Sequence, residues 1–329
     1  MNPSAPEPEI IDSAAAVLRS GGLVAFPTET VYGLGGNALD TEAISRIFAA
    51  KGRPSYNPLI VHVADTAAAS ELVLDWPDQA VQLADEFWPG PLTLVVHKKP
   101  IVPHSVTAGM ETVALRVPSH PVAHALLAAA GVPVAAPSAN RSTEISPTTA
   151  AHVLKGLSGR IDVVLDAGEC TVGIESTVVD LSGAEPTLLR SGTLEVAALE
   201  AVLGKQLRSA GHFDEAAARP APGMMARHYA PRARLVLSGA AAREEFAGEA
   251  RALADSAGIL GVITISQQIP SAAHHHVRMS ADAREYARDL YAALHRMDDA
   301  GCGAILVERV PTDPAWAGVR DRLQRAAHP

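Results

Sequence analysis

The fold is decided by the stretch Phe26-Pro27-Thr28-Glu29-Thr30-Val31-Tyr32-Gly33-Leu34-Gly35. It continues a short apolar segment, Leu23–Phe26, which has the length and composition of a buried strand. Hydroxyl side chains and glycines therefore follow a strand directly, and open α/β sheets place their ligands at such strand ends. The same composition also fits a structural turn in front of a capped helix. The motif alone leaves these two interpretations about equal.

A second polar turn holds two cations. Lys51-Gly52-Arg53 ends a predicted helix and leads through Ser55-Tyr56-Asn57-Pro58 into a new strand. Cations at a helix C-terminus complement its dipole, which is worth under about 1 kcal/mol each, and this is the structural interpretation. Arg also forks around phosphate oxygens while Lys supplies a point charge, so the pair suits a triphosphate as the alternative interpretation.

Two more hydroxyl-rich positions leave alternatives open. Ser138-Ala139-Asn140 follows a predicted strand, and its amide and hydroxyl can either read a polar ligand or close an Asx turn. Ser146-Pro147 can act in a ligand loop, or as an N-cap with Pro at the first helical position.

Charged and imidazole side chains also occur inside predicted strands. Arg116 lies among apolar neighbours, so it needs an anionic partner if it is buried, and we expect a carboxylate-bearing substrate to supply one. His62, taken singly, fits a hydrogen-bonded core histidine as well as a ligand contact. Contiguous histidines in an extended segment point to opposite faces, so His274–His276 predicts no metal site.

Hydrophobic periodicity divides the chain into alternating helices and strands. The predicted helices span 10–20, 41–50, 79–87, 121–130 and 147–157, with Asp40 or Thr41 capping the second. The predicted strands span 23–26, 59–63, 92–96, 112–117, 132–136, 163–166, 176–181 and 187–190. Because helices separate only some of these strands, the pattern favours a twisted mixed sheet with flanking helices over a strictly doubly wound one.

The second part of the chain has a different organisation. Residues 207–233 lose the period and are rich in Gly, Pro and Ala, which is typical of a linker. Beyond them, strands and helices alternate regularly, which predicts a small Rossmann-like α/β domain with a mainly parallel sheet. We therefore expect a catalytic domain at 10–206, a linker or lid at 207–233 and a small C-terminal domain at 234–329.

Composition narrows the functional classes. The formal charge of -9 and the pI near 5.8 argue against a dominant basic surface for nucleic acid. Two widely spaced cysteines, Cys170 and Cys302, indicate neither a disulfide framework nor a zinc site, so a reducing cytoplasm fits best. The acidic, Pro-rich N-terminus has no features of a signal peptide. The longest charge-free stretch, 118–140, carries two histidines and four prolines, which argues against a membrane span.

Six motifs in order resemble the L-threonylcarbamoyladenylate synthases, the YrdC-like enzymes of tRNA modification, in the long form with an appended C-terminal domain. They are the turn Pro27–Gly35, Lys51-x-Arg53, Asn57-Pro58-Leu59-Ile60, Ser138-x-Asn140, Gly173-Ile174-Glu175-Ser176-Thr177, and Pro222-Gly223-Met224 to His228-Tyr229-Ala230-Pro231. The resemblance runs from about Ile10 to Pro231. Ser142-Thr143 and Met225-Ala226 depart from residues common in the family.

The resemblance implies a reaction and a set of site residues. The family condenses L-threonine, bicarbonate and ATP, with Mg²⁺ present, into threonylcarbamoyl-AMP and pyrophosphate. By resemblance, Lys51 and Arg53 neutralise phosphate charge as the catalytic cations. The implied ATP contacts are Arg53, Asn57, Thr112, Asn140, Ser146, Arg190 and Tyr229, and the implied threonine contacts are Thr30, His62, Arg116, Ser138 and Ser176. The ligands of the metal are not implied.

The resemblance also implies partners and leaves two alternatives. The product would pass to a separate tRNA threonylcarbamoyl transferase complex that modifies adenosine 37, and the resemblance also allows a weak direct contact with tRNA. A lid at 220–231 would close Tyr229 over the nucleotide. One alternative is a nucleic-acid-binding module, which the acidic charge disfavours. The other is carbamoyl transfer from carbamoyl phosphate, whose known proteins carry zinc-finger segments with C-x-x-C pairs that this sequence lacks.

Overall fold

The structure, a computed structural model, describes residues 6–210, 228–240, 242–265 and 268–328. The chain forms two compact units. The first comprises Met1–Ser142, Ser146–Thr171 and Glu175–Met224, and the second Thr143–Ile145, Val172–Ile174 and Met225–Pro329. The predicted lid falls largely on residues 211–227, outside the described residues.

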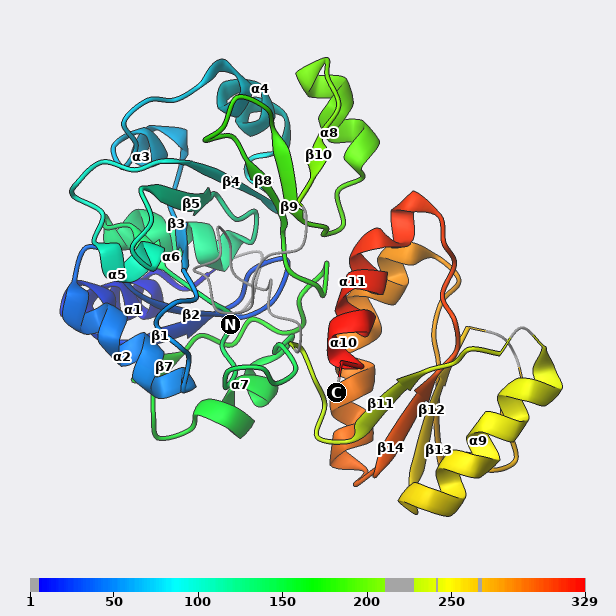
Figure 1. The fold of residues 1–329 in the computed structure, drawn as a ribbon. Coiled ribbons are helices and arrows are strands. Elements are labelled where there is room, and N and C mark those ends of the chain that lie inside the picture. Colours follow the sequence, from blue (N-terminus) through cyan, green and yellow to red (C-terminus); the bar gives the residue numbers. More distant parts are fainter. Residues whose placement is uncertain (1–5, 211–227, 241, 266–267, 329) are drawn as a thin grey trace. The chain divides into compact units, whose positions relative to one another are not determined.

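The first unit is built on one large mixed sheet with helices packed against it (Figure 1). Its strand order is β10-β9-β8-β4-β5-β3-β6-β2-β1-β7. The strands are β1 (Val24–Phe26), β2 (Gly33–Asn37), β3 (Ile60–His62), β4 (Leu92–His97), β5 (Thr112–Arg116), β6 (Val134–Ala135), β7 (Val163–Val164), β8 (Thr177–Asp180), β9 (Thr187–Arg190) and β10 (Arg208–Ser209). The helices are α1 (Pro8–Arg19), α2 (Thr41–Lys51), α3 (Thr66–Ser70), α4 (Asp78–Phe87), α5 (His104–Thr107), α6 (Pro121–Ala130), α7 (Ala150–Leu157) and α8 (Val196–Leu203). The predicted mixed sheet with flanking helices is confirmed.

The second unit contains an all-parallel sheet with the order β11-β14-β12-β13. Its elements are β11 (Arg234–Leu237), α9 (Arg243–Ala257), β12 (Leu260–Thr264), β13 (His275–Arg278), α10 (Ala283–Asp299), β14 (Ala304–Val307), a 3-10 turn η1 (Pro314–Trp316) and α11 (Ala317–Ala326). Figure 1 shows α9 on one face of this sheet and α10 with α11 on the other. The predicted parallel α/β architecture is confirmed.

The glycine-rich end of the opening motif is a strand, whereas its sequence predicts a turn. Gly33–Asn37 form β2, which pairs antiparallel with both β1 and β6. A Cβ atom at Gly35 would lie 2.8 Å from the Phe26 ring and 2.9 Å from the Val134 side chain. The glycines at 35 and 36 therefore admit neighbouring core side chains rather than a ligand, and sheet packing overrides the low strand propensity of glycine.

We expect Gly35→Ala to destabilise the first unit by about 1–3 kcal/mol, because the added methyl group overpacks the contact with Phe26 and Val134. Urea denaturation measures the change. Gly183→Ala is the control, since a Cβ atom there meets nothing within 4 Å. Equal stabilities of the two variants would contradict the packing explanation.

Two helix termini decide alternatives left open by the sequence. Asp40 caps α2 by accepting from the backbone N–H groups of Glu42 and Ala43, and Gly52 ends the helix in the left-handed conformation. Ser146 is not an N-cap, because α7 begins at Ala150 with Thr149 as its cap. The short elements α3, α5, α8 and β10 were not predicted from the sequence.

Among the described helices, none has both the length and the apolar character needed to cross a bilayer.

Candidate active site

The two faces of the large sheet differ in character. Side chains alternate between faces along a strand, and residues paired across strands share a face. Val61, Leu115, Leu94 and Val179 lie on the face that packs into the main core of the first unit. Over β3, β4, β5, β8 and β9, the opposite face carries a small apolar cluster of described residues, namely Ile60, Val95, Ala114, Val178 and Leu189.

Polar side chains surround that small cluster on the same sheet face. His62 pairs with Arg116 in the β3–β5 register, two positions beyond Ile60 and Ala114. Thr112 also shares the face of Ala114, because it lies two positions earlier on β5. We call this set the polar face and define it by Thr93, His62, Thr112, Arg116, Ser176 and Arg190. Five of these six residues were predicted as site residues.

Arg116 is buried beside the opening motif. Its Nε donates to the carbonyl of Gly90 at 3.2 Å, and one terminal nitrogen donates to Thr30 Oγ1 at 2.9 Å. The other terminal nitrogen lies 2.7 Å from Glu29 Oε1, and both side chains are almost fully buried. Glu29 therefore supplies a counter-charge to Arg116 within the protein, and a contact between Arg116 and a substrate carboxylate stays a prediction.

The Glu29 carboxylate has unused acceptor capacity. Among the described residues, neither of its oxygens accepts a hydrogen bond, so the contact with Arg116 is an ion pair without hydrogen-bond alignment. A buried carboxylate normally has its lone pairs satisfied. Glu29 is therefore placed to accept from an N–H or O–H donor of a ligand.

Thr30 is fixed by its own turn as well as by Arg116. The hydroxyls of Thr28 and Thr30 lie 2.8 Å apart, and Thr28 Oγ1 also donates to the carbonyl of Val31 at 2.6 Å. The backbone N–H groups of Thr30 and Val31 donate back to Thr28 Oγ1. The turn is thus ordered before any ligand binds, which preserves the position of the Thr30 hydroxyl.

His62 lies next to Arg116 and is held neutral. Burial and the adjacent Arg116 guanidinium lower the pKa of His62 to about 3. Its Nδ1 has no hydrogen-bond partner among the described residues, and its ring lies edge-on to Phe26 with the ring centroids 6.2 Å apart. A core histidine would have its buried nitrogens hydrogen-bonded, and Nδ1 of His62 is not hydrogen-bonded within the described part of the chain. The neutral imidazole therefore favours a ligand contact over a core role.

The His62 pKa predicts a pH dependence of stability. Its folded pKa is lowered to about 3, so between that value and its unfolded pKa near 6.5 the unfolded state binds more protons. The stability contribution of His62 is therefore present above about pH 6.5 and is lost as the pH falls, with a limiting slope of about 1.4 kcal/mol per pH unit.

His62→Phe is expected to flatten the dependence of the unfolding free energy on pH between about 4 and 6 relative to the unchanged protein. Urea denaturation at several pH values gives both curves, and their difference isolates His62 from the other titrating groups. Parallel curves would show that His62 titrates normally in the folded protein.

Lys51 joins the end of α2 to the loop that follows β6. Its ammonium donates to the carbonyls of Ser138 and Asn140 at 2.5 Å each, and it lies 3.3 Å from Asn140 Oδ1. Ser138 Oγ donates to the same Asn140 oxygen at 2.6 Å. The structure thus brings together three predicted residues, Lys51, Ser138 and Asn140, in one buried contact.

Arg53 and Asn57 form a second local contact. The Arg53 Nε donates to the carbonyl of Asn57 at 3.2 Å, and a terminal nitrogen donates to the carbonyl of Pro58 at 2.8 Å. Both side chains are buried, at 8% and 1% exposure. The guanidinium therefore closes the turn between α2 and β3, close along the chain to Lys51.

Ser176 and Arg190 meet where β8 begins and β9 ends. Arg190 donates through Nε to the carbonyl of Ser176 and through a terminal nitrogen to Ser176 Oγ, both at 3.0 Å. Ser176 Oγ also lies 2.7 Å from Thr93 Oγ1. Beside them, Ser146 donates to Glu175 Oε1 at 2.5 Å. These contacts gather Ser146, Ser176 and Arg190 in one part of the first unit.

Tyr229 belongs to the second unit, whereas the other predicted site residues belong to the first. It adopts a positive φ of 60° and is 1% exposed. Its ring centroid lies 5.8 Å from that of Tyr291 and 5.2 Å from the guanidinium carbon of Arg322. A contact between Tyr229 and ATP stays a prediction.

Sequence reasoning missed three residues of the site, Glu29, Thr93 and Glu175. Glu29 and Glu175 lie inside the quoted motifs, each beside a hydroxyl residue that was predicted. Thr93 interrupts the apolar strand Leu92–His97 on the polar face, so alternation along that strand could have revealed it. The site roles of Glu29 and Glu175 could not be predicted from the sequence, because the sequence does not show which side chains they contact in the fold.

Comparisons with known proteins cover both units. Residues 16–192 match a family model described as "Telomere recombination", which is named for Sua5, YciO and YrdC. Residues 194–328 match a model described as "Threonylcarbamoyl-AMP synthase, C-terminal domain". The two matches together span nearly the whole chain.

Relatives and a solved structure agree with these models. The chain is 41% identical to a threonylcarbamoyl-AMP synthase of Pyrococcus abyssi, covering 95% of this chain and 93% of the relative. It is 40% identical to a Bacillus subtilis threonylcarbamoyl-AMP synthase, with 96% and 92% covered. A crystal structure of P. abyssi Sua5 complexed with L-threonine is similar with a TM-score of 0.91 and 41% identity, covering 98% of this chain and 95% of that one. The chain therefore belongs to the threonylcarbamoyl-AMP synthase family, in the form that carries the additional C-terminal domain.

Proposed function

We propose that the chain condenses L-threonine, bicarbonate and ATP into threonylcarbamoyl-AMP and pyrophosphate, with both larger substrates bound in the first unit. The observation that carries this proposal is the burial of four cations, Lys51, Arg53, Arg116 and Arg190, among hydroxyl side chains. Guanidinium and ammonium groups suit the anionic oxygens that a nucleoside triphosphate and an amino acid supply. Membership of the synthase family supports the same reaction.

The proposed threonine subsite combines opposite charges. Arg116 takes the substrate carboxylate, the unused acceptor positions of Glu29 receive its ammonium group, and Thr30 contacts the polar backbone of the substrate. The neutral imidazole of His62 and the hydroxyls of Ser138 and Ser176 complete the subsite. The related P. abyssi structure was solved with L-threonine, which supports a threonine subsite in this family.

The proposed nucleotide subsite uses the remaining cations. Lys51 and Arg53 face the phosphates as the catalytic cations, and Arg190 adds charge from the end of β9. The amides and hydroxyls that contact ATP are Asn57, Thr112, Asn140 and Ser146, with Tyr229 as a further contact. Because Lys51 already orders the 138–140 loop, the loop amide is held before the nucleotide binds.

The chemistry needs positioning and charge stabilisation more than a general base. The threonine amine attacks the carbon of bicarbonate and water leaves, which gives a carbamate. A carbamate oxygen then attacks the α-phosphorus of ATP, and the bond to pyrophosphate breaks. Buried cations stabilise the charge that develops on the departing pyrophosphate. Exclusion of water protects the carbamate and its mixed anhydride from hydrolysis.

Mg²⁺ would enter with the nucleotide. Among the described residues, no group of three His, Cys, Asp or Glu side chains is placed to hold a metal ion. Magnesium is commonly bound by substrate phosphates, water and one or two carboxylates, so such a group is not required. The ion would neutralise phosphate charge beside Lys51 and Arg53.

The product would pass to a separate transferase complex that modifies adenosine 37 of tRNA. A direct, weak contact of this chain with tRNA and a cytoplasmic location are part of the same proposal. The net charge of -9 supports transfer of a small-molecule product over tight binding of RNA.

The reaction is tested by pyrophosphate release from ATP in the full chain, with threonine, bicarbonate and Mg²⁺ each omitted in turn. Release is expected only when all are present, with threonylcarbamoyl-AMP detected by mass spectrometry. Release that ignored both threonine and bicarbonate would overturn the assignment. Salt-dependent binding of tRNA without pyrophosphate release would favour the nucleic-acid-binding alternative.

A further inference from the structure

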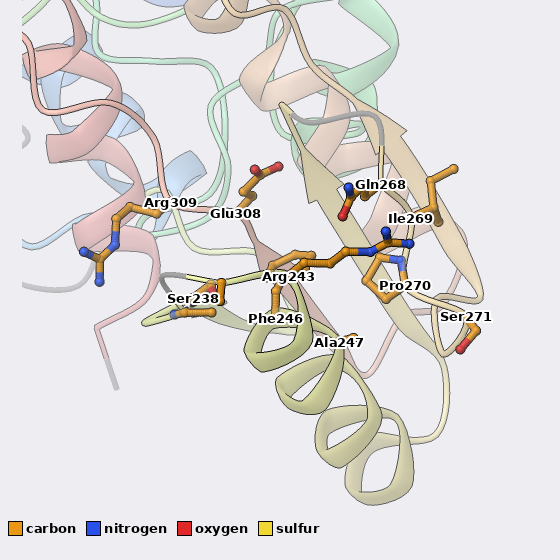
Figure 2. Close-up of a pocket in the computed structure, with 12 residues that line it drawn as sticks. Ser238, Arg243, Phe246, Ala247, Gln268, Ile269, Pro270, Ser271, Glu308 and Arg309 are labelled. Atoms are coloured by element: carbon orange, nitrogen blue, oxygen red, sulfur yellow. Dashed lines mark hydrogen bonds between the residues drawn. The ribbon is translucent and has the colours of Figure 1, made fainter.

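The second unit contains a cavity that the proposed reaction does not use. It has a volume of about 530 Å³, which lies in the range of ordinary small-molecule sites. Three loops at the carboxyl ends of β11, β12 and β14 line it, together with the first turn of α9. Figure 2 shows Arg243 extending from α9 towards Gln268 and Pro270, with Ser238 and Glu308 on neighbouring loops.

The topology explains why a cavity forms at this place. The chain leaves β11 for α9 on one face of the parallel sheet, and it leaves the adjacent strand β14 for α11 on the other face. Connections that diverge from neighbouring parallel strands open a crevice at the carboxyl ends, and open α/β sheets bind ligands in that crevice. The cavity residues Ser238 and Glu308 directly follow β11 and β14.

The loop after β11 is held in place by side chains. Ser238 Oγ donates to Glu249 Oε2 at 2.6 Å, and the backbone N–H of Gly239 donates to Glu249 Oε1 at 3.2 Å. Arg309 donates to the carbonyl of Gly239 at 3.1 Å. Across the cavity, Glu308 accepts from the backbone N–H of Ile265 at 2.8 Å. The walls are therefore ordered in advance, which lowers the entropic cost of binding a ligand.

Two arginines line the cavity, Arg243 and Arg309, and Arg309 donates to the carbonyl of Gly239. Arg243 is exposed and lines the cavity, and it makes no hydrogen bond or ion pair with any residue that the structure describes. A guanidinium in this position suits the forked oxygens of a phosphate group. Glu244 and Glu245 already complement the dipole of α9, so the charge of Arg243, and not the helix end, would bind an anion.

The remaining walls fit a ribose and a base. A carboxylate has about four acceptor positions, so Glu308 can accept from sugar hydroxyls in addition to the Ile265 N–H. Phe246 and Pro270 provide apolar surface, and Ile269 stays 56% exposed at the cavity. Because Arg309 already donates to the Gly239 carbonyl, Arg243 is the guanidinium proposed to bind one phosphate group, and the negative charge of Glu308 would repel further phosphates.

We infer that the second unit binds a nucleoside monophosphate in this cavity, with its phosphate on Arg243, its ribose hydroxyls on Glu308 and its base against Phe246 and Pro270. None of the residues that line this cavity belongs to the proposed reaction site. The inference does not depend on the proposed function, since it rests on contacts inside the second unit.

AMP is the probe that tests the inference. The full chain is saturated with a non-hydrolysable ATP analogue and L-threonine, and AMP is then titrated by isothermal calorimetry. One AMP per chain is expected to bind. Arg243→Ala should weaken this binding at least about tenfold, because a charge-assisted contact with phosphate is lost. Ala247→Trp, which fills the cavity, should abolish it.

Arg251→Ala is the matched control, because Arg251 is exposed on the same helix and does not line the cavity. It should bind AMP normally, and all three variants should keep their thermal unfolding temperature and their pyrophosphate release. No AMP binding to the saturated chain, or equal binding by the Arg243 and Arg251 variants, would overturn the inference. Inorganic phosphate binding as tightly as AMP would overturn its nucleoside part.

Discussion

Arg116→Met is expected to reduce pyrophosphate release at least about 100-fold and to destabilise the first unit by about 3–5 kcal/mol. The reduced rate follows from loss of the guanidinium proposed to hold the threonine carboxylate. The lower stability follows because the buried Glu29 carboxylate, 2.7 Å from Arg116, loses its counter-charge. Threonine-dependent release and urea denaturation measure the two effects.

A second variant separates these effects. Glu29→Gln combined with Arg116→Met removes both buried charges, so most of the lost stability should return. Activity should not return, because the proposed threonine subsite then lacks both its cation and its anion. If the double variant recovered activity together with stability, Arg116 would have a purely structural role.

Lys51→Met is expected to lower the rate of pyrophosphate release by about 100- to 1000-fold, the usual effect of removing one charge-stabilising donor. Lys51 donates to the carbonyls of Ser138 and Asn140, so its loss also releases the loop that carries the predicted Asn140 contact. Steady-state kinetics at varied ATP and threonine should show a lower kcat and a higher KM for ATP.

Lys98→Met is the control for the loss of a buried lysine. Lys98 is 4% exposed and donates to the carbonyl of Val102 at 3.0 Å, so it also fixes a backbone turn, but it is not part of the proposed site. This variant should lose stability and keep its kinetic constants. Equal kinetic losses in the two variants would mean that Lys51 acts by holding the fold.

Much of the architecture could be predicted, because capping residues, hydrophobic periodicity and helix-ending glycines in the sequence agree with the fold. The helix at 41–51 has a capping Asp40, an apolar face and Gly52 at its end, and the structure shows all three. Strand β2 could not be predicted in this way, because the residues of Gly33–Asn37 have a poor strand propensity. Only the neighbouring Phe26 and Val134 side chains explain why glycine is needed there.

The sequence predicted which residues belong to the candidate site better than it predicted which of them contact one another. Arg116 was expected to need an anion, and burial in the structure supports that reasoning. The sequence predicted a substrate as that anion, and the structure adds a second one, Glu29, within the protein. Glu29 lies 87 positions earlier in the chain, and nothing in the sequence pairs the two residues. Long-range pairs of this kind depend on the order of the strands in the sheet. The alternation of apolar and polar residues along each strand does not reveal that order.

The sequence by itself determined the positions of most strands and helices, the mixed and parallel character of the two sheets, and the motifs of the family, since these depend on periodicity and short-range spacing. Only the tertiary structure decided that β3, β4, β5, β8 and β9 share one polar face, because their order in the sheet is not their order in the chain. It also decided that Arg116 meets Glu29 and that Lys51 orders residues 138–140. The physical reason is that a buried charge selects its partner by proximity in the folded chain, which is set by packing between distant segments.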